Sequence, residues 1–283
     1  MISRRNCAGA IASVVLRGQN MFANAEAYER FMGRWSRLVA PLLVDFARLP
    51  EEGEVLDVGS GTGALSFAVA QKKPKVRVVG IDPSKEYVAY AARRDMFPPR
   101  TRFETGDAQS LRFADSAFGG SVSLLVFNFI PDPGKALREV RRVTAAGGSI
   151  SAAVWDYPEG MKMLRVFWDA AVGVDAGAEK RDEKHMPLSR PGELAKLWTQ
   201  GGLENVEERP LDVEMKFQSF ADYWEPFLLG QGPAGAYASS LSKDALTALR
   251  AAVRSRLSVK NENTGFTLPG RVWAVRGTAP NRH

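Results

Sequence analysis

The residues best suited to chemistry in this chain lie in one short segment, residues 54–63, where an apolar stretch ends in three closely spaced glycines. An apolar strand, a glycine-rich turn and a following helix, expected here at 64–71, are typical of nucleotide-binding folds. Glycines let the backbone approach a ligand where a Cβ atom would clash. An acid two residues before the first glycine favours a cationic ligand over a phosphate. The candidate ligand-binding residues of this turn are Asp57, Gly59, Ser60, Gly61, Thr62 and Gly63.

A second acid, Asp82, closes the next apolar segment, residues 76–81, about 20 residues after the glycine turn. A carboxylate there can accept hydrogen bonds from both hydroxyls of a ribose, because it acts only as an acceptor. Pro83 and Ser84 follow and are counted with it as binding candidates. The alternative role of Asp82 is to cap the helix that Pro83 and Ser84 begin, and both roles can hold together.

The string Val-Leu-Asp-Val-Gly-Ser-Gly-Thr-Gly at residues 55–63 resembles the first motif of class I S-adenosylmethionine (SAM)-dependent methyltransferases. The resemblance covers roughly residues 28–155 and is to the group that includes ubiquinone and menaquinone C-methyltransferases. It implies an enzyme with SAM as its cofactor, and Asp57 near the amino-acid end of SAM. The implied reaction is direct in-line transfer of the methyl group to a small acceptor. Residues 128–131 do not match the motif of enzymes that methylate amino groups on nucleobases or glutamine, which favours an oxygen or carbon acceptor, and the aromatic residues of the expected lid favour a partly apolar one.

The same resemblance implies roles for residues farther along the chain. Asp107 and Ala108 match the family's Gly-Asp-Ala segment, which meets the adenine edge, although Asp107 can equally form a turn of its own. Phe127 and Asn128 are counted as cofactor-binding candidates at the end of the expected fourth strand.

An N-terminal helix folds over the cofactor in similar enzymes, and Tyr28 and Arg34 are the candidates for that role here. An arginine can pair with the SAM carboxylate, and an aromatic ring can pack beside its sulfonium. The alternative is that the apolar stripe of this helix simply faces the core.

Two departures from the family pattern bear on the chemistry. Residues 118–119 read Phe-Gly where the family often has Phe-Asp, and no histidine stands near the end of the fourth strand. That histidine would have been a candidate proton acceptor. A general base is optional in this reaction, and the remaining candidates are His185, Tyr157 and Asp156. His185 lies in a charged loop, where a histidine is often simply exposed.

Two other classes of function stay open at this point. A non-catalytic SAM-binding regulatory protein would need the same turn and acids but no base. An NAD(P)-dependent oxidoreductase fits the spacing Gly59-x-Gly61-x-x-Ala64, which satisfies the dinucleotide fingerprint. Turnover of SAM would separate an enzyme from a non-catalytic SAM-binding protein. Binding of NADH instead of SAM would indicate an oxidoreductase.

Composition excludes several further classes of protein. Hydrophobic residues make up 45% and charged residues 25% of the chain, as in ordinary globular proteins, and no apolar run is long enough to cross a bilayer. One cysteine and two histidines are too few for a disulfide or a cysteine- or histidine-based metal centre, so we expect no metal. The net charge of +6 falls by half without residues 1–20, which argues against nucleic acid as a partner. We expect a monomer or a homodimer.

Residues 1–20 form a separate question, because two arginines there precede a short apolar run. We expect a disordered extension, with a targeting peptide as the alternative. The need for cytosolic SAM favours a cytoplasmic protein.

The order of the expected strands and helices predicts an α/β fold of the Rossmann-like, doubly wound type. Its sheet should have seven mostly parallel strands, with helical insertions that form a lid. We expect a single methyltransferase domain over 21–283. Its parts are two N-terminal helices at 21–50, a cofactor-binding core at 51–155, and a substrate lid at 156–188 and 218–262. The fourth strand is expected at 122–129, the fifth at 149–155, the sixth at 206–215 and the last at 266–276.

Overall fold

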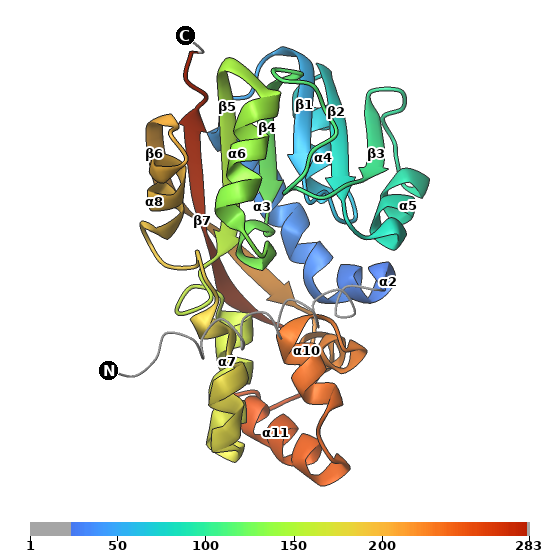
Figure 1. Ribbon diagram of the computed structural model, residues 1–283. Helices are drawn as coiled ribbons and strands as arrows, with labels where there is room; N and C mark the ends of the chain where they lie inside the picture. The colour runs from blue at the N-terminus through green and yellow to red at the C-terminus, as the bar shows by residue number, and fades with distance from the viewer. Residues whose placement is uncertain (1–23, 282–283) are drawn as a thin grey trace, which may run out of the picture.

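The computed structural model describes residues 24–281 and shows one seven-stranded sheet with the strand order β3-β2-β1-β4-β5-β7-β6 (Figure 1). Strands β1 to β5 pair in parallel, and β7 alone runs in the opposite direction, antiparallel to both of its neighbours, β5 and β6. The predicted Rossmann-like fold is therefore confirmed. The strands are β1 (Glu52–Val58), β2 (Lys75–Asp82), β3 (Thr101–Thr105), β4 (Phe118–Leu124), β5 (Thr144–Trp155), β6 (Glu204–Phe217) and β7 (Phe266–Thr278).

The strand order reverses between β1 and β4, which are neighbours although β2 and β3 lie between them in sequence. In open sheets of this kind, ligands bind in the crevice outside the carboxyl ends of the strands at such a switch point. The glycine turn follows β1, and Asp82 is the last residue of β2. Both therefore lie at the edge where a ligand is expected.

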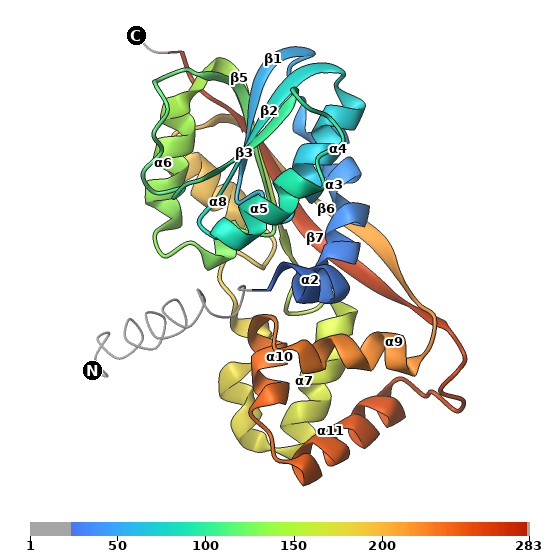
Figure 2. The ribbon, with the colours of Figure 1, turned by 90° about the vertical axis from the view of Figure 1, so that its right-hand side faces the viewer.

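Helices cover both faces of the sheet, with α3 and α4 on one side and α6 and α8 on the other (Figure 2). The N-cap of α6 is Asp132, whose side chain accepts a hydrogen bond from the backbone N–H of Lys135, followed by Pro133 as predicted. These helices are α3 (Arg34–Ala47), α4 (Ala64–Lys72), α6 (Pro133–Val143) and α8 (Glu193–Gln200), and α5 (Lys85–Arg93) packs against β2 and β3.

The N-terminal region is one continuous helical run rather than two separate helices. It begins at α2 (Ala25–Tyr28), widens into the π-helical turn η1 (Glu29–Gly33) and continues as α3. The predicted extension at 1–20 lies outside the described residues.

The predicted fourth strand was placed too far along the chain. β4 ends at Leu124, Leu125 adopts a φ of 63°, and η2 (Phe127–Phe129) is a short 3-10 helix. An apolar run alone cannot distinguish a strand from a buried turn, because both are hydrophobic. The last residues of the apolar run therefore form a turn at the carboxyl ends of the strands, where a ligand is expected.

The predicted lid segments form a layer of helices beyond the carboxyl ends of the parallel strands, which we call the helical cap (Figures 1 and 2). Its α7 packs against α11, and rings from both segments meet in its interior, where Phe167 and Phe227 stack with centroids 4.4 Å apart. The cap comprises α7 (Lys162–Val174), η3 (Ala176–Arg181), η4 (Glu183–His185), α9 (Phe220–Trp224), η5 (Glu225–Leu229), α10 (Gly232–Ser239) and α11 (Lys243–Arg256).

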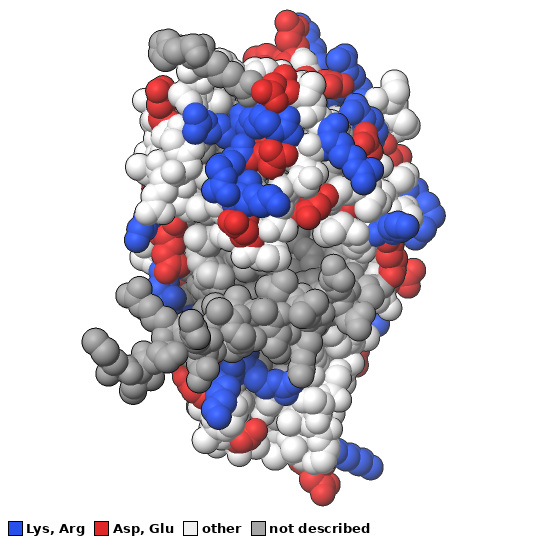
Figure 3. Space-filling view, viewed as in Figure 1, with Lys and Arg blue, Asp and Glu red and all other residues white. Residues whose placement is uncertain are grey.

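Charges of both signs are interspersed on the face seen in Figure 3. The basic end of α6 is used within the fold, since Arg142 bonds to Glu139 and Asp115 and Arg141 donates to the carbonyl of Gly201. None of the helices within residues 24–281 combines the length and apolar character that crossing a bilayer requires.

Candidate functional site

The glycine turn is held against the end of β2. The backbone N–H groups of Gly59 and Ser60 both donate to the carbonyl oxygen of Ile81 at 2.8 Å. Gly61 has a φ of 53°, and a Cβ atom built on it would meet nothing nearer than the ring of Tyr87 at 4.0 Å. At Gly59, by contrast, a Cβ atom would overlap Val126 at 2.5 Å. Gly59 is therefore required for packing, whereas Gly61 opens onto free space beside Tyr87.

Asp82 faces the same space from the end of β2. One carboxylate oxygen accepts a hydrogen bond from the backbone N–H of Gly61 at 3.0 Å, and the other from that of Ser84 at 2.8 Å. Ser84 itself is the N-cap of α5, and Pro83 is exposed between the two. Burial, the largest cause, raises the pKa of Asp82 to about 6, although both backbone bonds lower it.

Asp57 lies beneath the turn and is fully buried. One of its oxygens accepts a hydrogen bond from the hydroxyl of Ser66 at 2.6 Å, and the other has no partner. Burial raises the pKa of Asp57 to about 7, and the charge of Asp82 adds to this. Within residues 24–281, neither Asp57 nor Asp82 forms an ion pair with a lysine or arginine. The site therefore holds two carboxyl groups and leaves a cation to come from a ligand.

Two tyrosines line this space, of which the sequence reasoning found only Tyr28. The rings of Tyr28 and Tyr87 lie 5.3 Å apart, and the hydroxyl of Tyr28 contacts that of Ser36 at 3.3 Å. The hydroxyl of Tyr87 is buried and has no partner. Burial raises the pKa of Tyr28 to about 12. Both rings stay neutral at physiological pH and present aromatic surface suited to a cation.

Glu29 was also missed by the sequence reasoning. It extends from η1 to the turn, where it accepts a hydrogen bond from the hydroxyl of Thr62 at 2.5 Å. It also pairs with Arg37 and Arg94. The helical run is thereby fixed to the turn. Gly63, with a φ of 93°, is the N-cap residue that begins α4.

Asp107 and Ala108 lie beside Asp82, because the backbone N–H of Gly106 donates to the Asp82 carbonyl at 3.1 Å. Asp107 is exposed and accepts a hydrogen bond from the backbone N–H of Gln109 at 2.8 Å. Asp107 thus forms the turn that was the alternative to adenine binding. Its other carboxylate oxygen remains available to a ligand.

Phe127 and Asn128, just after the end of β4, have different surroundings. The ring of Phe127 packs against Trp198 with centroids 5.0 Å apart, so it contributes to the core beneath α8. Asn128 is buried, and its amide group faces the hydroxyl of Tyr157, but neither amide atom makes a hydrogen bond of regular geometry. Of the two, Asn128 has the unmet polar groups that a ligand would satisfy.

Arg34 is engaged away from the glycine turn. Its guanidinium forms a two-pronged ion pair with Asp222, at 2.6 and 3.0 Å, and donates to the carbonyl oxygen of Lys216. It also lies over the ring of Trp35, 4.1 Å from the centroid. These bonds join α3 to β6 and α9, so the structure gives Arg34 a role in fixing the cap.

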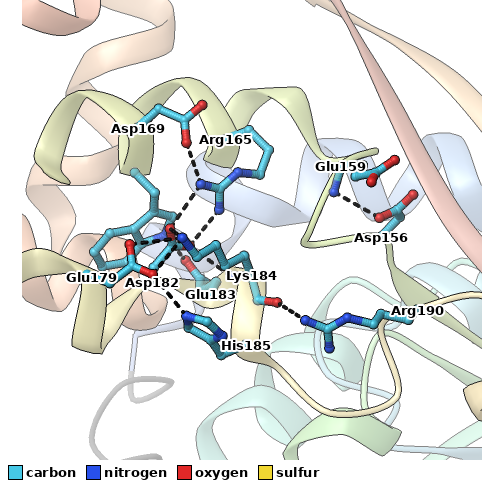
Figure 4. Close-up of polar contacts among 11 residues, drawn as sticks. Asp156, Glu159, Arg165, Asp169, Glu179, Asp182, Glu183, Lys184, His185 and Arg190 are labelled. Atoms are coloured by element: carbon cyan, nitrogen blue, oxygen red, sulfur yellow. Dashed lines mark hydrogen bonds and ion pairs between the residues drawn. The ribbon is translucent and has the colours of Figure 1, made fainter. Parts of the chain in front are cut away.

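His185 lies apart from the other two candidate bases, Asp156 and Tyr157, which are neighbours in the chain. Asp156 is buried and accepts a hydrogen bond from the backbone N–H of Glu159, apart from the charged cluster in which the exposed His185 contacts Glu179 (Figure 4). Tyr157 is buried, and burial raises the pKa of its hydroxyl well above 10. Tyr157 therefore stays protonated at neutral pH and can donate a hydrogen bond.

The fold and the site together define a Rossmann-like domain that binds a nucleoside-type ligand carrying positive charge. The ribose-type acid at the end of β2, the open glycine and the two carboxyl groups without cations all fit SAM, which joins a nucleoside to a sulfonium and an ammonium group. Within residues 24–281, no three Asp, Glu, His or Cys side chains are placed to hold a metal ion.

Comparison with known proteins gives the family. Residues 56–152 match the model of a methyltransferase domain. The chain is 30% identical over 182 residues to the 2-phytyl-1,4-naphtoquinone methyltransferase of Thermosynechococcus vestitus, covering 60% of this chain and 80% of that protein. The chain thus belongs to the class I SAM-dependent methyltransferases, as its motifs predicted.

A malonyl-[acyl-carrier protein] O-methyltransferase of Halorhodospira halophila is 32% identical over 131 residues, which cover 46% of this chain and 44% of that protein. The chain spans about half the length of several curated relatives that it matches. Among solved structures, the phosphoethanolamine N-methyltransferase 2 of Haemonchus contortus in complex with SAM has a TM-score of 0.57 at 15% identity, covering 96% of this chain and 60% of that one. This likeness shows the fold.

Proposed function

We propose that this protein is an enzyme that transfers the methyl group of SAM to a small, partly apolar acceptor, at oxygen or carbon. The observation that carries the proposal is the pair of buried carboxyl groups, Asp57 and Asp82, beside the open face of Gly61. Two neighbouring acids without a basic partner disfavour an anionic pyrophosphate and favour a cation. This arrangement supports SAM over a nicotinamide dinucleotide.

SAM would lie along the carboxyl ends of β1, β2 and β3. Asp82 would accept hydrogen bonds from the ribose hydroxyls, and Asp107 and Ala108 would meet the adenine edge. Asp57 and the glycine turn would hold the amino-acid end, with Tyr28 and Tyr87 beside it. When bound, SAM supplies a methyl group on a positively charged sulfur, a reactive donor in itself.

The chain's own contribution would then be alignment and exclusion of water. The helical cap supports this role, because its interior is aromatic and it lies beyond the carboxyl ends of the parallel strands (Figure 2). We propose that the cap segments 156–188 and 218–262 form the lid over the acceptor. We also place the protein in the cytoplasm, where SAM is available.

Calorimetry with SAM, S-adenosylhomocysteine and NADH tests the proposal. We expect binding of the first two and none of NADH. Release of S-adenosylhomocysteine with a panel of quinols, phenols, amines and carboxylic acids then tests turnover. Binding without turnover on any acceptor would leave a non-catalytic SAM-binding protein, and NADH binding without SAM binding would overturn the proposal.

A further inference from the structure

The helical cap holds a buried carboxyl group, that of Glu183. Glu183 belongs to η4, in the charged run 179–184, yet only 5% of its surface is exposed. Its Oε2 accepts a hydrogen bond from the indole N–H of Trp168 on α7 at 2.8 Å. The backbone N–H of Ala234, in the first turn of α10, also faces it. The carboxyl group is thus fixed from two sides.

Glu183 also faces Tyr157, and through Tyr157 the cofactor residues. The hydroxyl of Tyr157 lies close enough to Glu183, Asn128 and Tyr28 for all three to affect its pKa. Tyr28 packs on Tyr87 beside the glycine turn. Tyr157 lies two residues after the end of β5, so this group of side chains is at the junction of the sheet and the cap.

Two buried side-chain amides near this junction have unmet hydrogen-bonding capacity. The Oε1 of Gln231 has no partner, and the amide of Asn128 faces the hydroxyl of Tyr157 without a bond of regular geometry; each residue is more than nine-tenths buried. Gln231 is the N-cap residue of α10, three residues before Ala234. An unpaired buried polar atom destabilises the folded protein. Such atoms are explained if a polar ligand satisfies them.

On the basis of the proposed methyl transfer, we propose that the acceptor carries a phenolic hydroxyl group and that Glu183 accepts its proton. Glu183 takes this proton as the oxygen–carbon bond to the methyl group forms and the carbon–sulfur bond breaks, with that bond's electron pair remaining on sulfur. Asn128 and Gln231 bind the other polar groups of the acceptor. The aromatic interior of the cap receives its ring.

The charges around Glu183 support a neutral hydroxyl group over a carboxylate as the acceptor. Arg165, the cation that faces Glu183, is already bonded to Asp182 at 2.5 Å and to Asp169 at 2.6 Å (Figure 4). A carboxylate acceptor would therefore be repelled by the negative charge of Glu183. Arg165 could not offset this repulsion, because it already pairs with two aspartates. A hydroxyl group instead offers the proton that Glu183 needs.

The protonation of Glu183 also suits a base at neutral pH. Burial raises its pKa to about 7, and the charge of Asp182 raises it further, whereas the Trp168 bond, Arg165 and the backbone N–H of Ala234 lower it. A base titrating near the working pH is the most effective. The rate should rise with pH to a plateau, with a midpoint at or below about 7, because the bound sulfonium lowers the pKa of a nearby carboxyl group.

The test compares Glu183→Gln with the matched control Glu179→Gln. Glutamine keeps an oxygen for the Trp168 bond but cannot accept the proton at neutral pH. Glu179 lies on the same segment, partly exposed, and bonds to Lys184 and His185. Calorimetry measures SAM binding, and the probes are 2-naphthol, 4-nitrophenol and 2-naphthoic acid, with S-adenosylhomocysteine release as a function of pH.

We expect SAM affinity within about twofold of wild type in both variants, because neither side chain contacts the cofactor residues. With 2-naphthol at pH 8, Glu183→Gln should lose about 100-fold in rate and lose the pH dependence below 7, the usual size for a general base. With 4-nitrophenol, which ionises without help, the loss should be much smaller. Glu179→Gln should match the wild type.

The outcomes separate the two proposals. No SAM binding by the wild type would overturn the proposed function and this inference with it. SAM binding with methylation of 2-naphthoic acid or an amine but of neither phenol would overturn this inference alone. Equal rates for Glu183→Gln and wild type with 2-naphthol, at every pH, would do the same.

Discussion

The carboxylate of Asp82 accepts a hydrogen bond from the backbone N–H of Gly61 at 3.0 Å, so the acid that ends β2 also fixes the turn that follows β1. Its other oxygen holds the N–H of Ser84 at the start of α5. One side chain thus joins the two loops that border the proposed SAM site. Because each oxygen has a second lone pair, both remain able to accept from a ribose.

Replacing Asp82 with alanine should weaken SAM binding by more than tenfold. The change removes charge-assisted hydrogen bonds to the ribose and also the anchor of the Gly61 turn. Calorimetry measures the dissociation constant. The matched control is Asp45→Ala, an acid on α3 that pairs only with Lys72 on the surface and should leave the affinity unchanged. An Asp82→Ala protein with wild-type affinity would contradict the ribose assignment.

Asp57→Asn should stabilise the free protein above pH 7 while weakening SAM binding by about tenfold. The pKa of Asp57 rises on folding to about 7, so the folded state binds more protons than the unfolded state between about pH 4 and 7. The folded protein therefore loses stability as the pH rises through this range. Asparagine removes the charge but keeps an acceptor for Ser66.

Differential scanning fluorimetry at pH 8 should show the melting temperature of Asp57→Asn raised by about 2 °C or more. Ser66→Ala serves as the control, because it removes only the hydrogen bond and should lower the melting temperature. A variant that is both less stable and unchanged in SAM affinity would show that Asp57 is structural alone.

SAM should stabilise the protein more at pH 8 than at pH 5.5. Burial raises the pKa of Asp57 to about 7 and that of Asp82 to about 6, and a bound cation favours the ionised form of each. Binding therefore releases protons near pH 6–7, and affinity falls as the pH falls through this range. Calorimetry in buffers of different ionisation enthalpy measures the released protons. An affinity that stays flat from pH 5.5 to 8 would argue against paired carboxyl groups at the cation.

Arg34→Ala should lower the melting temperature but leave SAM affinity within about twofold. The ion pair with Asp222 is about a quarter exposed and joins α3 to the cap, so its loss should cost about 1–2 kcal/mol, a few degrees. Asp222→Ala should cost about as much, and the double variant little more, because both remove one interaction. If Arg34→Ala alone lost SAM affinity, the original expectation of a contact with the SAM carboxylate would gain support.

Arg34 also shows where sequence reasoning stops. The glycine turn and its two acids could be located from local spacing, because the turn, the strand ends and the helix starts are each encoded within a few residues. The partner of Arg34 lies 188 residues away, on a segment without a motif. Only the folded chain brings Asp222 to the start of α3.

Glu183 was missed for a similar reason. It stands in a run of six acids and bases that is typical of an exposed loop, and nothing in the sequence indicated that two of them, Asp182 and Glu183, are buried. Its burial depends on Trp168 and the start of α10, which come from both segments of the cap. Asn128 was found by its place in the chain, but its unmet hydrogen bonds became visible only when β4 proved to end at Leu124.

Replacing Tyr87 with phenylalanine tests whether its hydroxyl group binds the cofactor or is only buried. The Tyr87 hydroxyl has no partner in the protein, so its removal should leave the melting temperature of the free protein unchanged or slightly raised. If the hydroxyl bonds to SAM, affinity should fall about fivefold, or about 1 kcal/mol. Tyr90→Phe on the same helix, where the hydroxyl accepts from Arg94, should leave SAM affinity unchanged. Equal affinities for Tyr87→Phe and wild type would restrict Tyr87 to packing its ring beside Gly61.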